Sequence, residues 1–214
     1  MDEIEYLSYN IKYLDMISVR EELAKTILQQ YTNKEISVVL DPTLLLDNSI
    51  YTRMATKINY TREYILLYQM EYSGELLDLS KKISKKLGLD VIEVIPDAIS
   101  LKRRYPYKIY HNGGPCDFLG LIRDANLILT NSFHGVAFSI IFRKPFYVVL
   151  HKSRGDRIRN LLVKLGLTSR IIKKEGFNEQ KIDYEVVLNL LNKEQLKSFA
   201  YIEKCIRYEN KKSF

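Results

Sequence analysis

Short apolar runs and longer amphipathic stretches alternate along this chain. Six runs of four or five residues are almost wholly apolar, and they predict strands at 16–19, 36–40, 64–68, 91–95, 127–130 and 146–150. These runs do not alternate between apolar and polar residues. They are therefore typical of strands that are buried on both faces of a parallel sheet.

Stretches with apolar positions three and four residues apart predict helices between the strands. The predicted helices cover 3–14, 21–31, 74–87, 117–125, 132–142 and 157–165, followed by two more at about 183–192 and 194–210. Strands that alternate with helices predict an α/β fold. We expect a Rossmann-like doubly wound parallel sheet of about six strands.

The chain has 214 residues, which suits one large domain or two small ones. No repeat, low-complexity tract or long linker interrupts it. We predict a single Rossmann-like domain over residues 1–214. Within it, residues 1–15 form a linker-type helix and residues 180–214 form the C-terminal helices.

The charge is uneven. The whole chain carries a net charge of +7, but residues 101–160 alone contain 11 basic and 3 acidic residues, which leaves the remainder at −1. Such a local surplus predicts an anionic partner: a phosphorylated or carboxylated small molecule, a nucleic acid or a lipid head-group surface.

Several protein classes lack support in this sequence. Two cysteines, Cys116 and Cys205, and three scattered histidines predict neither a disulfide framework nor a metal site. No apolar run approaches the roughly 20 residues of a membrane helix, and the acidic start does not resemble a signal peptide. We expect a reduced, cytoplasmic protein, or one at the inner face of the membrane, with no transmembrane segment. P-loop and dinucleotide-binding glycine patterns are missing too.

The first candidate site follows the strand at 127–130. There the sequence continues as Asn131-Ser132-Phe133-His134-Gly135 and enters an apolar helix. Asn131 or Ser132 suits the N-cap, and the helix N-terminus favours an anion. His134 lies in the first turn, and Gly135 permits close approach of a ligand. The alternative is that Ser132 only caps the helix and His134 bonds a neighbouring loop.

A second candidate is Arg20, which ends one predicted strand and begins a helix. An arginine there can hold a carboxylate or phosphate with two parallel hydrogen bonds. The alternative is an ion pair with Glu21, Glu22 or Asp41. Asp41 itself suits either a base or the cap of a turn with Pro42.

Two loops are further candidates. His111-Asn112-Gly113-Gly114-Pro115 has the composition of a turn, and it would also suit a loop over the site. The segment from Lys152 to Arg157 follows the last predicted strand, and its Arg157 is a candidate for anion binding.

Motifs spread along the chain resemble the polysaccharide pyruvyl transferase family. The most specific block comprises Gly114-Pro115-Cys116-Asp117-Phe118-Leu119, Thr130-Asn131-Ser132-Phe133-His134-Gly135 and Lys144-Pro145-Phe146. Ile17-Ser18-Val19-Arg20-Glu21 and Val39-Leu40-Asp41-Pro42-Thr43 resemble two earlier family motifs, and the helix 157–165 is similar to the segment after the block. The resemblance covers nearly the whole chain.

This resemblance implies transfer of a pyruvyl group from phosphoenolpyruvate to two hydroxyls of a sugar, with formation of a cyclic ketal and release of phosphate. It implies a glycosyltransferase-B-like enzyme of two Rossmann-like halves, in which His134 and Arg20 match residues that hold the donor. Ser132 stands where many relatives carry arginine. No cofactor is implied besides phosphoenolpyruvate as donor substrate.

The same resemblance sets expectations for partners. The acceptor would be a sugar or a lipid-linked oligosaccharide in exopolysaccharide biosynthesis. The chain has the length of the C-terminal half only, so we expect the N-terminal half to be a further domain or a separate subunit.

Two other functions stay open at this point. The chain could be half of a nucleotide-sugar-dependent glycosyltransferase, which titration with nucleotides would reveal. It could also be a non-catalytic module that pairs with a separate subunit. Nucleic acid is not an expected partner, because the buried helix that begins at Phe133 cannot enter a groove.

Overall fold

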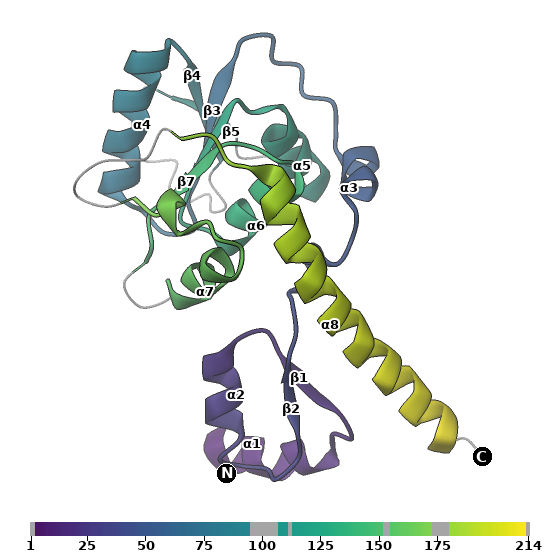
Figure 1. The fold of residues 1–214 in the computed structure, drawn as a ribbon. Coiled ribbons are helices and arrows are strands. Elements are labelled where there is room, and N and C mark those ends of the chain that lie inside the picture. Colours follow the sequence, from purple (N-terminus) through teal and green to yellow (C-terminus); the bar gives the residue numbers. More distant parts are fainter. Residues whose placement is uncertain (1–2, 95–106, 111–112, 152–154, 173–179, 213–214) are drawn as a thin grey trace. The chain divides into compact units, whose positions relative to one another are not determined.

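The computed structural model describes residues 3–94, 107–110, 113–151, 155–172 and 180–212 (Figure 1). Within these residues every strand pairing is parallel, which confirms the α/β class. The strands are β1 (Ile17–Val19), β2 (Ile36–Val38), β3 (Tyr64–Tyr68), β4 (Asp90–Val94), β5 (Lys108–Tyr110), β6 (Leu127–Thr130) and β7 (Phe146–Val148).

The strands form two sheets, so the expectation of six strands in one sheet is wrong. Strands β1 and β2 pair with each other, and the other five form a sheet in the order β5-β4-β3-β6-β7. The sequence pattern reports that a strand is buried but not which strand it pairs with, since any apolar run satisfies either sheet.

Helices occupy most of the remaining described residues. They are α1 (Glu3–Asn10), α2 (Glu22–Leu28), α3 (Asn48–Met54), α4 (Gly74–Leu87), α5 (Pro115–Asp124), α6 (Phe133–Ile141), α7 (Asp156–Lys164) and α8 (Tyr184–Lys212), with short 3-10 turns at Ile11–Tyr13, Pro42–Leu44 and Thr168–Arg170. The two predicted C-terminal helices are one helix, α8. The polar residues 192–194 between them contain no glycine or proline that would stop a helix. None of the described helices combines the length and apolar character needed to cross a bilayer.

The chain divides into two compact units, a division that the single-domain prediction does not contain. The first unit comprises Met1–Leu45 and Leu188–Phe214, and the second comprises Leu46–Val187. Each unit is described here by itself.

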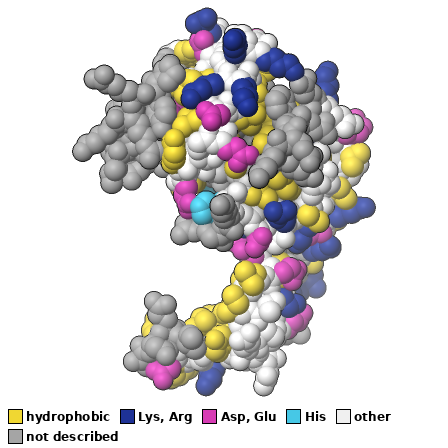
Figure 2. Space-filling model, turned by 90° about the vertical axis from the view of Figure 1, so that its left-hand side faces the viewer, with side chains coloured by type: hydrophobic (Ala, Val, Ile, Leu, Met, Phe, Trp, Pro, Cys, Tyr) yellow, Lys and Arg dark blue, Asp and Glu magenta, His cyan; other side chains and the backbone are white. Residues whose placement is uncertain are grey.

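The first unit is built on the β1–β2 pair. Ile11, Ile17 and Ile36 form its buried cluster. Helix α8 is tied to the end of β2, because the Ser198 hydroxyl accepts a 2.9 Å hydrogen bond from the Leu40 amide. Hydrophobic side chains gather on the face of this unit that is visible in Figure 2.

The second unit is the Rossmann-like part of the chain. Its strand order places β3 at the centre, with later strands added first on one side and then on the other. In such sheets ligands bind beyond the carboxyl ends of the strands, where the order reverses. Here that point lies between β3 and β6, whose last residues, Tyr68 and Thr130, are direct neighbours in the register.

The two faces of this sheet are covered by different helices. Helix α4 packs on the face that carries Ile65, Leu67 and Leu129. On the other face, Tyr68 meets Phe118 of α5, with ring centroids 4.6 Å apart. Helix α6 is apolar around its circumference and is buried from Gly135 to Ile141, so its N-terminus is held at a fixed place on the sheet.

Candidate functional site

A hollow of about 410 Å³ lies at the carboxyl edge of the five-stranded sheet. Its lining comes from the ends of three strands and from two helices: Tyr68, Val94, Tyr110, Gly113, Gly114, Pro115, Phe118, Leu121, His134 and Phe138. The hollow thus includes Tyr68 from the position where the strand order reverses, which is the place expected for a ligand in this topology.

His134 is an exposed residue on this hollow. It is the second residue of α6, where unpaired backbone N–H groups and the positive end of the helix dipole favour an anion. Its ring meets that of Phe133 edge to face, with centroids 5.6 Å apart. The sequence-based placement of His134 in the first turn of a buried helix is therefore correct, while its role stays a prediction.

Ser132 caps α6. Its side chain accepts a 3.4 Å hydrogen bond from the Gly135 amide, and its own amide donates to Thr130 Oγ1 at 3.0 Å. Burial raises the pKa of the Tyr68 hydroxyl, and a hydrogen bond with the Ser132 side chain acts in the opposite direction. Ser132 therefore connects the two strand ends that flank the expected ligand position.

Asn131 is engaged with the loop that follows β3. Its side-chain oxygen accepts from the Met70 amide at 2.9 Å, and its side-chain nitrogen donates to the Glu71 carbonyl at 2.7 Å. Both ends of the amide thus bond to protein backbone. The contacts describe a residue that holds a loop in place, and substrate binding by Asn131 stays a prediction.

Gly135 is close to a protein group. A Cβ added at this position would overlap the Thr130 hydroxyl and come within 3.0 Å of Thr130 Cβ. The close approach that the structure shows at Gly135 is to the Thr130 side chain, and approach of a ligand to Gly135 stays a prediction. This glycine lets α6 begin directly against the end of β6.

Arg157 lies beside the first turn of α6. It is the second residue of α7, and its guanidinium carbon is 3.8 Å from the centre of the Phe133 ring. A cation over an aromatic face at this distance is a favourable contact. The structure thus brings Arg157, Ser132 and His134 to one helix end. Residues 152–154, predicted as part of the same anion-binding loop, lie outside the described residues, as do 111 and 112.

Arg20 belongs to the first unit, whereas the other five predicted site residues belong to the second. Its guanidinium forms an ion pair with Asp41, one of the partners that the sequence allowed. The Arg20 side chain is 47% exposed and that of Asp41 only 3%. That Arg20 and His134 hold one ligand stays a prediction.

Asp41 follows the prediction of a turn cap. Its carboxylate accepts from the Thr43 amide at 3.1 Å and from the Thr43 hydroxyl at 2.7 Å. Burial acts to raise the pKa of Asp41, but the hydrogen bonds from Thr43 and the charge of Arg20 together hold it below its usual range. Asp41 is therefore a charged anchor for Arg20.

Sequence reasoning missed the aromatic wall of the hollow. Tyr110 lies against Gly113, where a Cβ would overlap the Tyr110 ring, and burial together with its contact to Asp117 raises the pKa of Tyr110. Asp117 also accepts a 2.8 Å hydrogen bond from the Gly114 amide. The Gly113-Gly114 pair is a sequence signal for this close packing, although its composition alone indicates only a turn or a loop over the site.

Five of the eleven basic residues between 101 and 160 lie outside the described residues: Lys102, Arg103, Arg104, Lys152 and Arg154. Figure 2 shows Lys and Arg side chains interspersed with Asp and Glu over the second unit. No group of three or more His, Cys, Asp or Glu side chains suited to a metal ion occurs among the described residues.

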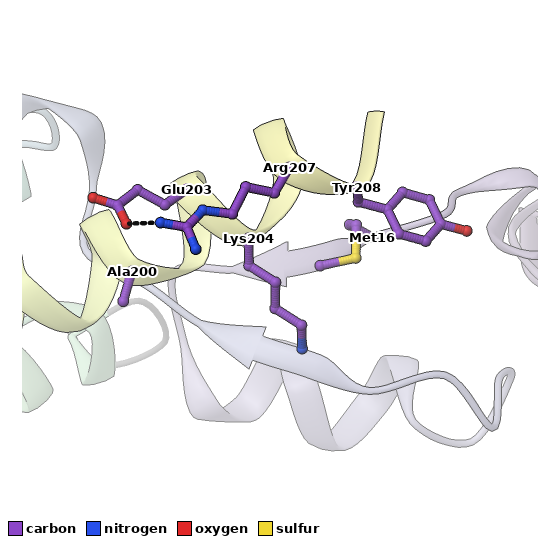
Figure 3. A pocket seen from close by; sticks show the side chains of 6 residues that line it. All are labelled: Met16, Ala200, Glu203, Lys204, Arg207 and Tyr208. Atoms are coloured by element: carbon purple, nitrogen blue, oxygen red, sulfur yellow. Dashed lines mark ion pairs between the residues drawn. The ribbon is translucent and has the colours of Figure 1, made fainter. Parts of the chain in front are cut away.

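The first unit has a hollow of its own, of about 380 Å³ (Figure 3). It is lined by Met16, Ala200, Glu203, Lys204, Arg207 and Tyr208. Arg207 pairs with Glu203 at 3.7 Å, and Lys204 pairs with Glu35 at 3.0 Å, all on exposed side chains. No predicted site residue lines this hollow.

Comparisons with solved structures give similarities at low sequence identity. One is a glycosyltransferase of kitacinnamycin (13% identity, 67% of this chain and 42% of that chain, TM-score 0.47). Another is the UDP-GlcNAc 2-epimerase of Methanocaldococcus jannaschii (17%, 83% and 60%, 0.43), and a third is the wall teichoic acid polymerase TagF (12%, 93% and 55%, 0.44). The chain spans about half the length of these proteins.

A comparison with curated proteins found no match. The family model for polysaccharide pyruvyl transferase, in contrast, matches residues 3–153. The match includes both early motifs and the whole block from Gly114 to Phe146, but it ends before the helix 157–165, which the sequence resemblance had included. The chain belongs to the polysaccharide pyruvyl transferase family.

Proposed function

We propose that this chain takes part in transfer of a pyruvyl group from phosphoenolpyruvate to two hydroxyls of a polysaccharide sugar, with a cyclic ketal and phosphate as products. Family membership supports this reaction class. The observation that carries the proposal is the position of His134, exposed on a hollow at the N-terminus of the buried helix α6.

The donor suits this position chemically. Phosphoenolpyruvate carries a phosphate and a carboxylate, and a helix N-terminus stabilises negative charge. Protonated His134 would neutralise the phosphate and protonate the leaving group or the enol carbon. Arg157, over Phe133, adds a positive charge beside the same helix end.

Arg20 would hold the donor carboxylate or a phosphate oxygen. An arginine has five N–H donors, and its pairing with Asp41 gives its guanidinium a defined orientation. Fixing the donor in this way would reduce the entropy lost on the way to the transition state. The acceptor would be a sugar or a lipid-linked oligosaccharide, and a further domain or subunit would supply the other half of the enzyme.

Phosphate release tests the proposal. The chain, together with the domain or subunit that supplies the other half of the enzyme, is incubated with phosphoenolpyruvate and with polysaccharide from the source cells whose ketals have been removed by mild acid. We expect inorganic phosphate and a new ketal methyl signal in the proton NMR spectrum of the polymer, in equal amounts. Phosphate without ketal, or neither product, would contradict pyruvyl transfer.

One observation favours a second candidate, half of a nucleotide-sugar glycosyltransferase. The hollow is larger than a three-carbon donor needs, and Tyr68, Tyr110 and Phe118 offer aromatic faces to a flat ring. Titration of the chain with phosphoenolpyruvate and, separately, with UDP distinguishes the two. Tighter binding of UDP would favour the glycosyltransferase.

A further inference from the structure

A contact between a histidine and a carboxylate, which no sequence motif indicated, joins the ends of two strands that are not neighbours. His151 Nε2 faces the carboxylate of Glu71. Glu71 follows β3 and His151 follows β7, and β6 lies between these two strands. The pair therefore bridges the carboxyl edge of the sheet at the end of β6, where α6 begins.

Both partners are held in place by other contacts. The Asn131 amide bonds to the backbone of Met70 and Glu71, which fixes the loop that carries the carboxylate. On the other side, Gly155 packs so closely on His151 that a Cβ there would overlap the His151 carbonyl oxygen. The imidazole and the carboxylate are thus positioned by their loops as well as by each other.

Helix α7, which begins directly after Gly155, packs on the helix turn that carries His134. Arg157 follows two residues after Gly155, and its guanidinium lies over the Phe133 ring at 3.8 Å. That ring in turn contacts the His134 ring. Glu71 and His151 follow the two strands that flank β6, so the pair lies at the same edge of the sheet from which α6 begins.

We propose, on the basis of the proposed function, that His151 is the catalytic base that accepts a proton from the acceptor sugar, and that Glu71 is its positioning residue. With Nε2 turned to the carboxylate, the accepting nitrogen is Nδ1. A carboxylate that faces one imidazole nitrogen fixes the tautomer and stabilises the imidazolium that forms. The side chains of His151 and Glu71 are 36% and 41% exposed, so a sugar hydroxyl can approach.

The proton balance of the reaction requires such a group. In the first addition the acceptor O–H bond breaks, its oxygen bonds to C2 of the donor, and the proton passes to His151. The electrons of the C2–C3 double bond take a proton from His134, which makes the methyl group. In the second addition another hydroxyl oxygen bonds to C2 as the C2–O bond to phosphate breaks. Its proton restores His134, and His151 returns its proton to the departing phosphate.

The experiment uses the full chain and the domain or subunit that supplies the other half of the enzyme, with phosphoenolpyruvate and the acid-treated cell polysaccharide. Replacing the base, as His151→Ala, should lower kcat by about 10²-fold or more and leave KM for phosphoenolpyruvate unchanged. Added imidazole should restore part of the rate. Glu71→Gln should lower kcat by about tenfold and shift the acidic limb of the pH–rate profile, where the base becomes protonated. His151→Gln should show the same drop in kcat as His151→Ala, with little change in side-chain volume.

The matched control removes an ion pair at the opposite edge of the sheet. Arg62 and Asp90 pair at 3.0 Å, and Asp90→Asn should leave kcat unchanged. A wild-type chain that forms no product overturns the proposed function and this proposal with it. An active wild type with a fully active His151→Ala variant overturns only the role of His151. If His151→Ala turns over slowly, is not rescued by imidazole and has a lowered melting temperature, His151 only stabilises the fold. That result also overturns its role as the base.

Discussion

The Thr130 hydroxyl donates a 2.6 Å hydrogen bond to the carbonyl oxygen of Tyr68. This bond joins the last residues of the two strands between which the strand order reverses. The same hydroxyl accepts from the Ser132 amide, so one side chain connects β3, β6 and the cap of α6. The position of His134 therefore depends on a short chain of contacts that begins at Thr130.

His134→Ala should weaken phosphoenolpyruvate binding by at least about tenfold, because it removes the imidazole that we propose contacts the donor phosphate at the α6 N-terminus. Isothermal titration measures the affinity. Since His134 is exposed, the melting temperature should not change. Arg159→Ala, which removes an exposed cation from α7, is the control for net charge. If the wild type and His134→Ala bind phosphoenolpyruvate equally well, the His134 imidazole does not contribute to donor binding.

Gly135→Ala should destabilise the chain by about 1–3 kcal/mol, because its Cβ would overlap the Thr130 side chain. Urea unfolding gives the free energy of unfolding. Gly74→Ala is the matched control, since the nearest atom to a Cβ there is the Tyr72 hydroxyl oxygen at 4.0 Å. A Gly135→Ala variant as stable as Gly74→Ala would show that α6 can move away from β6.

Two serine N-caps allow an effect on stability to be distinguished from an effect on donor binding. Ser132→Ala on α6 and Ser73→Ala on α4 each remove a hydroxyl that accepts from the third helical residue, and each should cost about 1 kcal/mol of stability. Only Ser132→Ala should also weaken phosphoenolpyruvate binding. If the two variants bind phosphoenolpyruvate with equal affinity, Ser132 only caps the helix and does not contribute to donor binding.

The Arg157–Phe133 contact can be measured by a double-mutant cycle. Arg157→Ala, Phe133→Leu and the double variant should give a coupling free energy of about 0.5–2 kcal/mol in chemical unfolding. Values near zero would mean that the stacking does not hold the α7 loop against α6. The affinity of Arg157→Ala for phosphoenolpyruvate then measures separately how much the positive charge of Arg157 contributes to donor binding.

The Asp41 carboxylate makes stability depend on pH in the acid range. Because the folded pKa of Asp41 is lowered, its contribution is complete above the unfolded pKa of about 3.9 and is lost as the pH falls through the folded value. Asp41→Asn should therefore flatten the loss of stability below about pH 4. Parallel wild-type and Asp41→Asn curves of unfolding free energy against pH would contradict this assignment.

Local signals in the sequence were sufficient for some elements. Helix α4 begins at Gly74 and ends before Gly88, as predicted, because Gly88 takes the left-handed conformation with φ of 68° that closes a helix. Strand β5 was missed, since three residues with one aliphatic side chain do not form a recognisable run. Helix α3 was missed for a similar reason, as most of its seven residues are polar.

The candidate site was predictable only in part. The Ser132 cap and the place of His134 follow from local rules of helix starts. The contact of Arg157 with Phe133 joins residues that are 24 positions apart, and the Glu71–His151 pair joins residues that are 80 apart. Such pairs are set by strand order, and an apolar run does not encode which strand it will lie beside.

The burial of α6 on nearly every side has a consequence for how specificity would change within such a fold. A helix enclosed in this way offers evolution little freedom, since any shift of its axis would disturb both the sheet and its neighbours. New substrates would then be accommodated by the loops after the other strands, while the Ser-Phe-His-Gly corner, where we propose that the donor binds, would keep its position on the sheet.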